Sequence, residues 1–230
     1  MSRNESYDCA ICGVRHLCLA SGLSTDQQPK LREITKNRKQ VLAGQPIYEQ
    51  EEAFSSIFVM ISGASKAVVR QTSGKLSISH ITLRGDFMGF QGAAYGAMPE
   101  SQIALQDSVL CVISYRDLMA QIRREPVVGI QFHEAIARTS IHRQAMNLAI
   151  SSPSADGKVR GFLHWFMQQL SMRGYYHHDF TLPLTREELA NILGLRLETV
   201  SRAFSQLERR DFLKISGRRV LVTDSAALES

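Results

Sequence analysis

Residues 184–213, LTREELANILGLRLETVSRAFSQLERRDFL, contain two short helical patterns on either side of one glycine. Thr185 and Glu188 stand three residues apart and match a capping box, which predicts a helix that starts at about residue 186. Gly194 then supplies a turn, and a second amphipathic pattern follows it. Two short helices joined by a glycine-containing turn predict a helix-turn-helix.

The packing residues of this segment have the spacing A-x3-G-x5-V, formed by Ala190, Gly194 and Val200. A small residue at 190 lets the two helices approach closely, and Val200 packs the second helix on the first. The next segment, KISGRRVLVT (214–223), has the pattern of a tight hairpin. The hairpin and the two helices together predict a winged helix-turn-helix.

The second helix, expected over 197–210, would act as a recognition helix whose first turns face base edges in the major groove. Glu198, Ser201 and Arg202 share one face of it, because i, i+3 and i+4 positions are neighbours on a helix. An arginine can donate two hydrogen bonds to guanine, and a glutamate can accept one from cytosine N4. The alternative is an ordinary surface ion pair between Glu198 and Arg202; the surrounding motif favours DNA.

A second set of residues near the motif is suited to phosphate contacts, which position a domain without reading sequence. The formal net charge is +5, and arginines cluster at 196–210 and 218–219. This clustering favours double-stranded DNA as a partner, although a solvated basic face would have the same composition. The expected phosphate contacts are Arg196, Thr199, Arg209, Arg218 and Arg219.

The N-terminal half has a different sequence pattern, with short apolar runs separated by glycines between about Leu31 and Tyr115. Turn signals recur about every ten residues, which is typical of an antiparallel sandwich, barrel or roll. The expected turns are at Gly44, Gly63, Gly74 and Gly85.

After Tyr115 the hydrophobic period becomes helical, with one stripe spaced alternately three and four residues apart. We expect a long helix whose stripe pairs with the same helix of a second subunit, giving a two-fold homodimer. The alternative is that the stripe packs on the chain's own β domain. SSPSADGK (151–158) ends the helical pattern and marks a hinge. The stripe consists of Gly129, Phe132, Ile136, Thr139, Arg143, Met146 and Ile150.

Three of the four cysteines lie in CAICGVRHLC, residues 9–18, and the fourth is Cys111 in the apolar run SVLCVISY. Thiolates are the usual ligands of iron–sulfur clusters and of zinc. By themselves the three leave several interpretations open: iron–sulfur, zinc with His16 as a possible ligand, or unconnected thiols. Without the other three cysteines, Cys111 would be interpreted as a buried apolar residue.

The 230 residues are enough for one large or two ordinary domains, and no apolar run reaches the roughly 18–20 residues of a membrane span. MSRNESYDCA has no apolar core for a signal peptide, so we expect a cytoplasmic protein without structural disulfides. No catalytic acid–base constellation is visible, and His177-His178 reads as a solvated pair. We therefore expect no enzymatic activity.

The order of β-roll, long helix and winged helix resembles the CRP/FNR superfamily of bacterial transcription regulators, over essentially the whole chain. Its cyclic-nucleotide branch has an acidic residue after a glycine and, further on, an Arg-Ser pair for the phosphate. Gly85-Asp86 matches the first feature, but no arginine occurs between Arg84 and Arg116. We therefore expect no cyclic nucleotide.

The FNR branch (the fumarate and nitrate reduction regulators) has C-x2-C-x5-C near the N-terminus and one central cysteine. Cys9, Cys12, Cys18 and Cys111 match this pattern, and ETVSR (198–202) matches the branch's recognition segment. The resemblance implies that the four cysteines hold a [4Fe–4S] cluster that dioxygen degrades. It also implies that Glu198, Ser201 and Arg202 read TTGAT-type half-sites.

The resemblance further implies a homodimer that regulates anaerobic genes and contacts RNA polymerase, with the turn at Thr72–Lys75 as one candidate surface. We expect the intact cluster to order residues 1–22 and favour dimerisation, with Arg143 opposing dimers that lack the cluster; the family commonly has an acidic residue there. Two alternatives are a CRP-like regulator with a small ligand in the β-roll and a redox enzyme or electron carrier.

The predicted fold class is α+β, with a cysteine-rich loop, an antiparallel β-roll of jelly-roll type, a long dimerisation helix and a winged helix-turn-helix. The expected domains are 1–22 for the cluster segment, 23–117 for the β-roll, 118–151 for the dimerisation helix and 152–230 for DNA binding.

Overall fold

The computed structural model describes residues 9–24, 27–35 and 37–229. The chain separates into two compact units. The first contains Met1–Leu76 and Ile81–Thr139, and the second contains Ser77–His80 and Ser140–Ser230.

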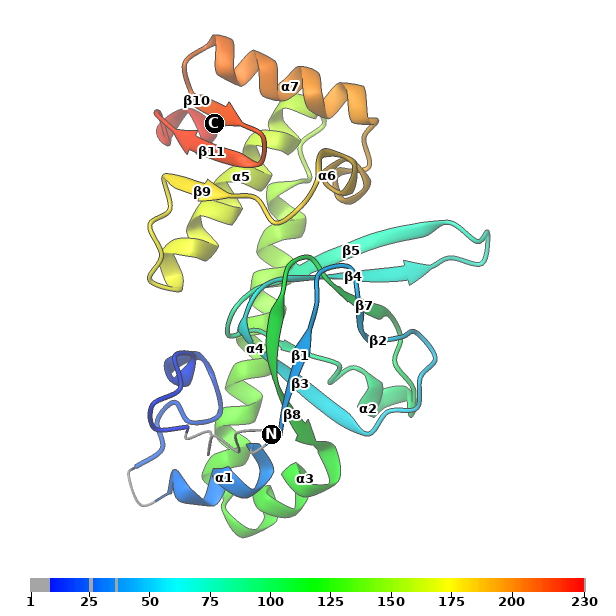
Figure 1. The fold of residues 1–230 in the computed structure, drawn as a ribbon, viewed down its shortest axis with the longest axis vertical. Coiled ribbons are helices and arrows are strands. Elements are labelled where there is room, and N and C mark those ends of the chain that lie inside the picture. Colours follow the sequence, from blue (N-terminus) through cyan, green and yellow to red (C-terminus); the bar gives the residue numbers. More distant parts are fainter. Residues whose placement is uncertain (1–8, 25–26, 36, 230) are drawn as a thin grey trace. The chain divides into compact units, whose positions relative to one another are not determined.

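The first unit is an antiparallel β-roll built from two four-stranded sheets (Figure 1). One sheet has the order β1-β8-β3-β6 and the other has the order β2-β7-β4-β5. The predicted roll is confirmed, and all four glycines expected in turns have a positive φ, from 80° to 99°. The strands are β1 (Asn37–Val41), β2 (Pro46–Tyr48), β3 (Ser56–Ser62), β4 (Ser65–Arg70), β5 (Leu76–Thr82), β6 (Phe87–Met88), β7 (Ser101–Ala104) and β8 (Ser108–Ser114).

The sheet that contains β3 and β8 is buried on both faces, because successive side chains of a strand point to opposite sides. Phe58, Met60 and Leu110 pack in one apolar core. Val59 and Cys111, one position along each strand, belong to a second core. Strand alternation therefore turns Cys111 away from the first core and into the second.

Helices cover the second core. They are α1 (Pro29–Thr35), α3 (Tyr115–Arg124) and the start of α4 (Pro126–Ala149). The unit also contains the short helix η1 (Arg15–Leu17), and α2 (Gly92–Tyr95), which follows β6. The single dimerisation helix expected over 118–151 is in fact two helices. Glu125 interrupts them with φ −133° and ψ 87°, because the ring of Pro126 disfavours a helical conformation at the preceding residue.

The long helix α4 turns much of its predicted stripe inward. Phe132, Thr139 and Met146 are 6%, 5% and 1% exposed in the single chain. The stripe proposed for a second subunit therefore faces its own chain at these positions, as the alternative interpretation expected. Ile130 and Ile141, by contrast, are 57% and 61% exposed.

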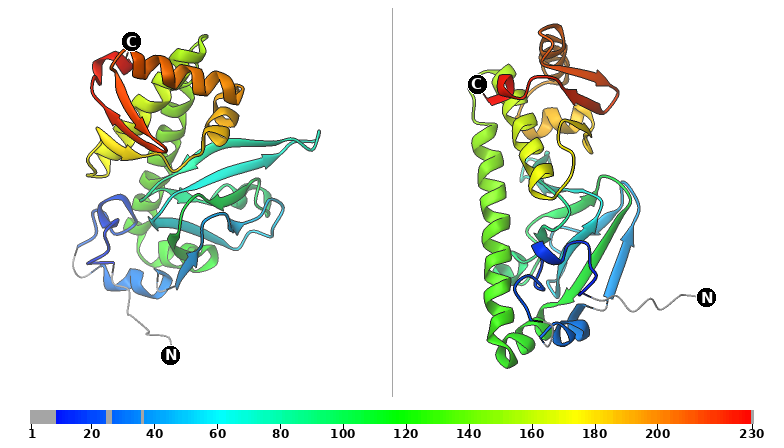
Figure 2. Two further views of the ribbon diagram at one scale, coloured as in Figure 1. Left: turned by 45° about the horizontal axis from the view of Figure 1, so that its top comes forward. Right: turned by 90° about the vertical axis from the view of Figure 1, so that its left-hand side faces the viewer.

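The second unit contains the C-terminal helices and a small antiparallel sheet of order β10-β11-β9 (Figure 2). Its core includes Phe162, Phe166, Val200 and Leu207, none more than 2% exposed. The predicted winged helix-turn-helix is confirmed. Its elements are α5 (Ala155–Met172), β9 (Asp179–Thr181), α6 (Arg186–Leu193), α7 (Leu197–Arg209), β10 (Leu213–Ser216), β11 (Arg219–Val222) and α8 (Ala226–Glu229).

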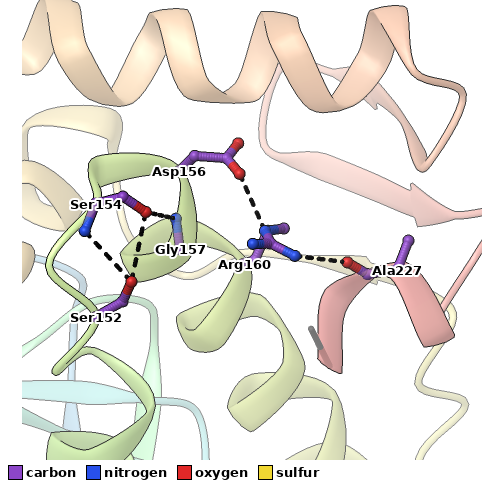
Figure 3. A network of polar contacts seen from close by, with 6 residues as sticks. All are labelled: Ser152, Ser154, Asp156, Gly157, Arg160 and Ala227. Atoms are coloured by element: carbon purple, nitrogen blue, oxygen red, sulfur yellow. Dashed lines mark hydrogen bonds and ion pairs between the residues drawn. The ribbon is translucent and has the colours of Figure 1, made fainter.

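Polar contacts fix the start of α5 (Figure 3). The Ser154 hydroxyl caps the helix by accepting from the backbone N–H of Gly157 at 3.0 Å. Arg160 pairs with Asp156 at 3.0 Å and donates to the carbonyl of Ala227 at 3.1 Å, which ties α5 to α8. No helix among the described residues is long and apolar enough to cross a membrane.

Candidate functional site

The helix-turn-helix is set by local interactions at both ends of α6. The Thr185 hydroxyl accepts from the Glu188 N–H at 3.1 Å, and the Glu188 carboxylate accepts from the Thr185 N–H at 2.7 Å. This is the predicted capping box. Gly194 ends α6 with φ 63°, a conformation that most other residues adopt only at a cost, so the chain can turn directly into α7.

Helix α7 separates a buried face from a polar one. Val200 and Leu207 are fully buried, whereas Glu198, Ser201 and Arg202 are exposed. Within the described part of the chain, Glu198 and Arg202 form no ion pair with each other, so the surface-pair alternative is not realised. The donors and acceptors of this face are available to a partner.

The predicted phosphate contacts fall around this face. Arg196 immediately precedes α7 and is exposed, while Thr199 in the first turn is half-buried. Arg209 is exposed near the end of α7, where its Nε donates to the Ser205 carbonyl at 3.3 Å. Arg218 lies in the exposed turn of the β10–β11 hairpin. These positions suit contacts with a DNA backbone.

Arg219, also expected to contact phosphate, instead forms a two-point pair with Asp179. The N–O distances are 2.8 and 2.5 Å, which is a bidentate arrangement. The hydrogen bonds to Arg219 hold the pKa of Asp179 below its usual value and raise the pKa of Arg219. Its charge is already compensated, which makes Arg219 a poorer phosphate ligand than Arg218.

Two interactions of the DNA-binding unit were not found from sequence. The direct cross-strand partner of Arg219 is Thr181, and Asp179 lies two residues away on the same strand, β9. The register between β9 and β11 therefore brings Asp179 near Arg219, and nothing in the local sequence indicates this pair. The Arg186 guanidinium lies 3.3 Å from the ring centre of Phe204, and burial lowers its pKa. This cation–π contact holds α6 against α7.

The four cysteines line a single small pocket in the first unit. Cys9, Cys12 and Cys18 come from the N-terminal loop, and Cys111 comes from the middle of β8. All four are free thiols: Cys9 and Cys111 are buried, and the other two are half-buried. The fold therefore gathers thiols from segments about a hundred residues apart.

The described residues contain no group of three His, Cys, Asp or Glu side chains arranged to hold one metal ion. A tetrahedral zinc site with Zn–S bonds of about 2.3 Å needs sulfurs within about 4 Å of one another. His16, the possible zinc ligand, is exposed and is not among the residues that line the pocket.

Electrostatics in the pocket disfavour uncompensated thiolates. Burial raises the pKa of Cys111 to about 12, and the Arg38 guanidinium opposes this rise. Burial likewise raises the pKa of Cys18 far above its usual value, and the nearby Cys111 adds to the effect. Because several thiolates together would repel one another here, the pocket suits a positively charged metal group that compensates them.

Thr35 and Arg38, at the junction of α1 and β1, contact two of the cysteines. The sulfur of Cys9 lies 3.1 Å from the Thr35 hydroxyl. The Arg38 guanidinium donates to the sulfur of Cys111 at 2.9 Å. These contacts orient one thiol from the loop and one from the sheet.

The N-terminal segment 9–24, which we call the cysteine loop, is also packed against the rest of the first unit. Leu19 and Leu23 share the second apolar core with Phe132 of α4. Arg84 donates to the carbonyl of Gly13 at 2.7 Å, which anchors the loop to the turn before β6. The loop and the inner face of α4 are therefore parts of one packed core.

Comparisons with known proteins agree with this architecture. Residues 38–125 match the family model described as a cyclic nucleotide-binding domain, and residues 157–230 match the Crp-like helix-turn-helix domain. The two matches correspond to the β-roll and to the winged helix-turn-helix.

Similar proteins cover nearly the full chain. The transcriptional regulatory protein btr of Bordetella pertussis is 29% identical over 98% of this chain and 93% of its own. The fumarate and nitrate reduction regulatory protein of Vibrio cholerae is 26% identical over 98% and 92%. The structure of FixK2 from Bradyrhizobium japonicum matches with a TM-score of 0.71 and 22% identity, covering 84% of this chain and 95% of that one.

Proposed function

Because the chain belongs to the CRP/FNR family of DNA-binding transcription regulators, we propose that it is an oxygen-responsive regulator of the FNR type. In this proposal the chain carries a [4Fe–4S] cluster, binds palindromic DNA as a homodimer in the cytoplasm and activates or represses genes of anaerobic metabolism. Family membership makes it a regulator and not an enzyme. The name of the Vibrio relative, a regulator of fumarate and nitrate reduction, supports this branch.

The observation that carries the proposal is the shared pocket of Cys9, Cys12, Cys18 and Cys111. Four thiolates are the ligand set of a [4Fe–4S] cluster, one for each iron. The sulfurs share one pocket, and their number matches the ligand set of the cluster. When bound, the cluster supplies a metal group that dioxygen can degrade.

The DNA-binding mechanism follows from the exposed face of α7. A TTGAT half-site contains one G·C pair. Arg202 can donate two hydrogen bonds to its guanine, and Glu198 can accept from its cytosine. Arg196 and Arg218 would contact flanking phosphates and fix the position of the helix in the groove. Two such helices one DNA turn apart match a palindromic site.

We place the dimer contact on the exposed face of α4. The exposed positions 130, 134, 137, 141, 144 and 148 follow one another at spacings of four and three, which is the repeat of a coiled-coil seam. Ile141 and Leu148 on this face are 61% and 67% exposed. Two copies of the face would bury these apolar side chains. Arg143, which is half-buried, lies outside this seam.

The cysteine loop can influence this dimer through the opposite face of the same helix. Leu19 and Leu23 of the loop pack in one core with Val128 and Phe132. If the loop loses its order when the cluster is lost, these helix residues lose packing partners. We infer that loop order stabilises the first half of α4, and thereby its outer face.

Two further parts of the proposal are contact with RNA polymerase and the domain boundaries. The turn at Thr72–Lys75 joins β4 to β5, and the residues of the turn are exposed. It is our candidate for the polymerase contact. We keep the boundaries 1–22, 23–117, 118–151 and 152–230 as a functional division, with 118–151 containing most of α3 and all of α4.

A CRP-like regulator with a small ligand in the β-roll is the second candidate, favoured by the match to a cyclic nucleotide-binding domain. Against it, large side chains such as Phe58, Met60 and Met88 pack within the roll. Asp86 accepts from the Leu83 N–H at 2.9 Å, so this acidic group already has a partner. We therefore expect no cyclic nucleotide.

Anaerobic purification with iron and sulfide analysis tests the proposal. Wild-type protein should contain about four irons and four sulfides per chain. Cys12→Ser and Cys111→Ser should each lose most of this iron, although they lie in distant segments. Iron-free wild-type protein would favour the ligand-binding alternative, and stoichiometric zinc would indicate a different metal site.

A further inference from the structure

One cation of the cysteine pocket is fixed by strand register. Strands β1 and β8 are antiparallel neighbours, and Arg38 is the direct cross-strand partner of Cys111. Side chains of direct partners lie on the same face of a sheet, about 5 Å apart at Cβ. The sheet therefore brings the Arg38 side chain to the cysteine, and its Nη1 donates to the Cys111 sulfur at 2.9 Å.

The guanidinium is held in this position by the backbone before β1. The same Nη1 donates to the carbonyl of Thr35 and, at 3.3 Å, to the carbonyl of Asn37. Arg38 is part-buried at the sulfur contact, where solvent screens the charge less than at an open surface. These partners lie on α1, β1 and β8.

The contact suits Cys111 in the role of a metal ligand. A sulfur that binds a metal is a thiolate, which only accepts hydrogen bonds. Arg38 offers this sulfur a charged donor at 2.9 Å.

We propose that Arg38 is a positioning residue for Cys111: its guanidinium orients this thiolate and offsets part of the negative charge of the four-cysteine ligand set. The inference rests on the proposed cluster. It gives β1 a role in the cysteine site that the spacing of the cysteines does not indicate. The same residue would contact the ligand sulfur and not the metal, so its effect is expected on retention of the cluster more than on its assembly.

The test compares Arg38→Gln, Arg38→Lys and Arg15→Gln with wild-type protein, all reconstituted anaerobically with iron and sulfide. Arg15 lines the same pocket and is exposed, so Arg15→Gln removes a charge of the same sign without removing a contact to sulfur. The rate of iron loss to an excess of a chelator is followed without oxygen. The melting temperatures of the metal-free proteins monitor the fold.

Arg38→Gln should lose iron about tenfold faster than wild type, within the range seen when a partner of a metal ligand is removed. Arg38→Lys should fall between the two because it keeps the charge but not the fork of the guanidinium, and Arg15→Gln should resemble wild type. A wild-type chain that takes up no cluster contradicts the proposed function, and the inference with it. Two outcomes overturn the inference alone, provided that wild type binds a cluster. In the first, Arg38→Gln releases iron at the wild-type rate; in the second, Arg15→Gln releases iron as fast as Arg38→Gln.

Discussion

The outward face of α4 gives the most specific prediction about assembly. Ile141 is 61% exposed in the single chain and Leu42, in the turn after β1, is 64% exposed. Glutamate at either position should change the stability of the single chain by at most about 0.5 kcal/mol, because both side chains are on the surface. Only Ile141 lies on the proposed dimer seam, so Leu42→Glu is a matched control.

The expected loss of dimer stability follows from the exposed area. Fully burying an isoleucine side chain contributes about 1.5–3 kcal/mol, and the exposed part of Ile141 corresponds to about 1–2 kcal/mol per copy. Two-fold symmetry doubles this to about 2–4 kcal/mol, a factor of about 30–700 in the dimer dissociation constant. Repulsion between two introduced carboxylates adds to the loss.

Sedimentation equilibrium of the anaerobically reconstituted proteins measures this constant. Ile141→Glu should be largely monomeric at concentrations where wild type and Leu42→Glu are dimeric. Equal dissociation constants for the two variants would refute the placement of the seam on this face. A dimer strengthened by Arg143→Ala and unaffected by Ile141→Glu would restore the inward stripe as the interface.

Other predictions concern the DNA-binding unit. Arg202→Ala should cost about 1–3 kcal/mol of specific binding and relax the preference for the G·C pair, whereas Arg218→Ala should weaken all sequences alike and reduce the salt slope by about one; titrations against mutated half-sites at several salt concentrations separate the two. Thr185→Ala should destabilise the unit by about 0.5–2 kcal/mol through loss of the helix cap, seen as a lower melting temperature; an unchanged one would contradict the capping box. Asp179→Asn should lower stability at neutral pH. The folded-state pKa of Asp179 is depressed, so its contribution is present above the unfolded-state pKa and disappears as pH falls through the folded value. Wild type and variant should therefore melt alike in strong acid, and a difference that persists there would exclude the pair with Arg219 as its cause.

The helix-turn-helix could be predicted from sequence because its signals are local. The capping box needs only Thr185 and Glu188, and the turn needs only Gly194, so neighbouring residues determine both ends of α6. The break at Glu125 also had a local signal in Pro126, which the hydrophobic period alone does not register.

The direction of the α4 stripe could not be predicted in the same way. A period of 3.5 residues shows that a helix has an apolar side, but not whether its own chain or a second chain covers that side. Both faces of α4 carry apolar residues: Phe132 and Met146 point inward, and Ile141 and Leu148 point outward. Only the packed structure distinguishes them.

The cysteine site could be predicted from sequence only in part. The spacing of Cys9, Cys12 and Cys18 is visible in the sequence. Strand alternation explains why the side chain of Cys111 points into the second core and not into the first. Arg38 was not identified, because its proximity to Cys111 depends on the register between β1 and β8. A register that joins residues more than seventy positions apart has no local signal.

The central claim is that an oxygen-sensitive cluster at the four cysteines controls DNA binding. The most direct measurement is the affinity of anaerobically purified protein for a duplex with two TTGAT-type half-sites, before and after air is admitted to the same sample. The account predicts tight binding together with a visible absorption band from the cluster, and loss of both in air. Equal affinity before and after exposure, with the band lost, would contradict it.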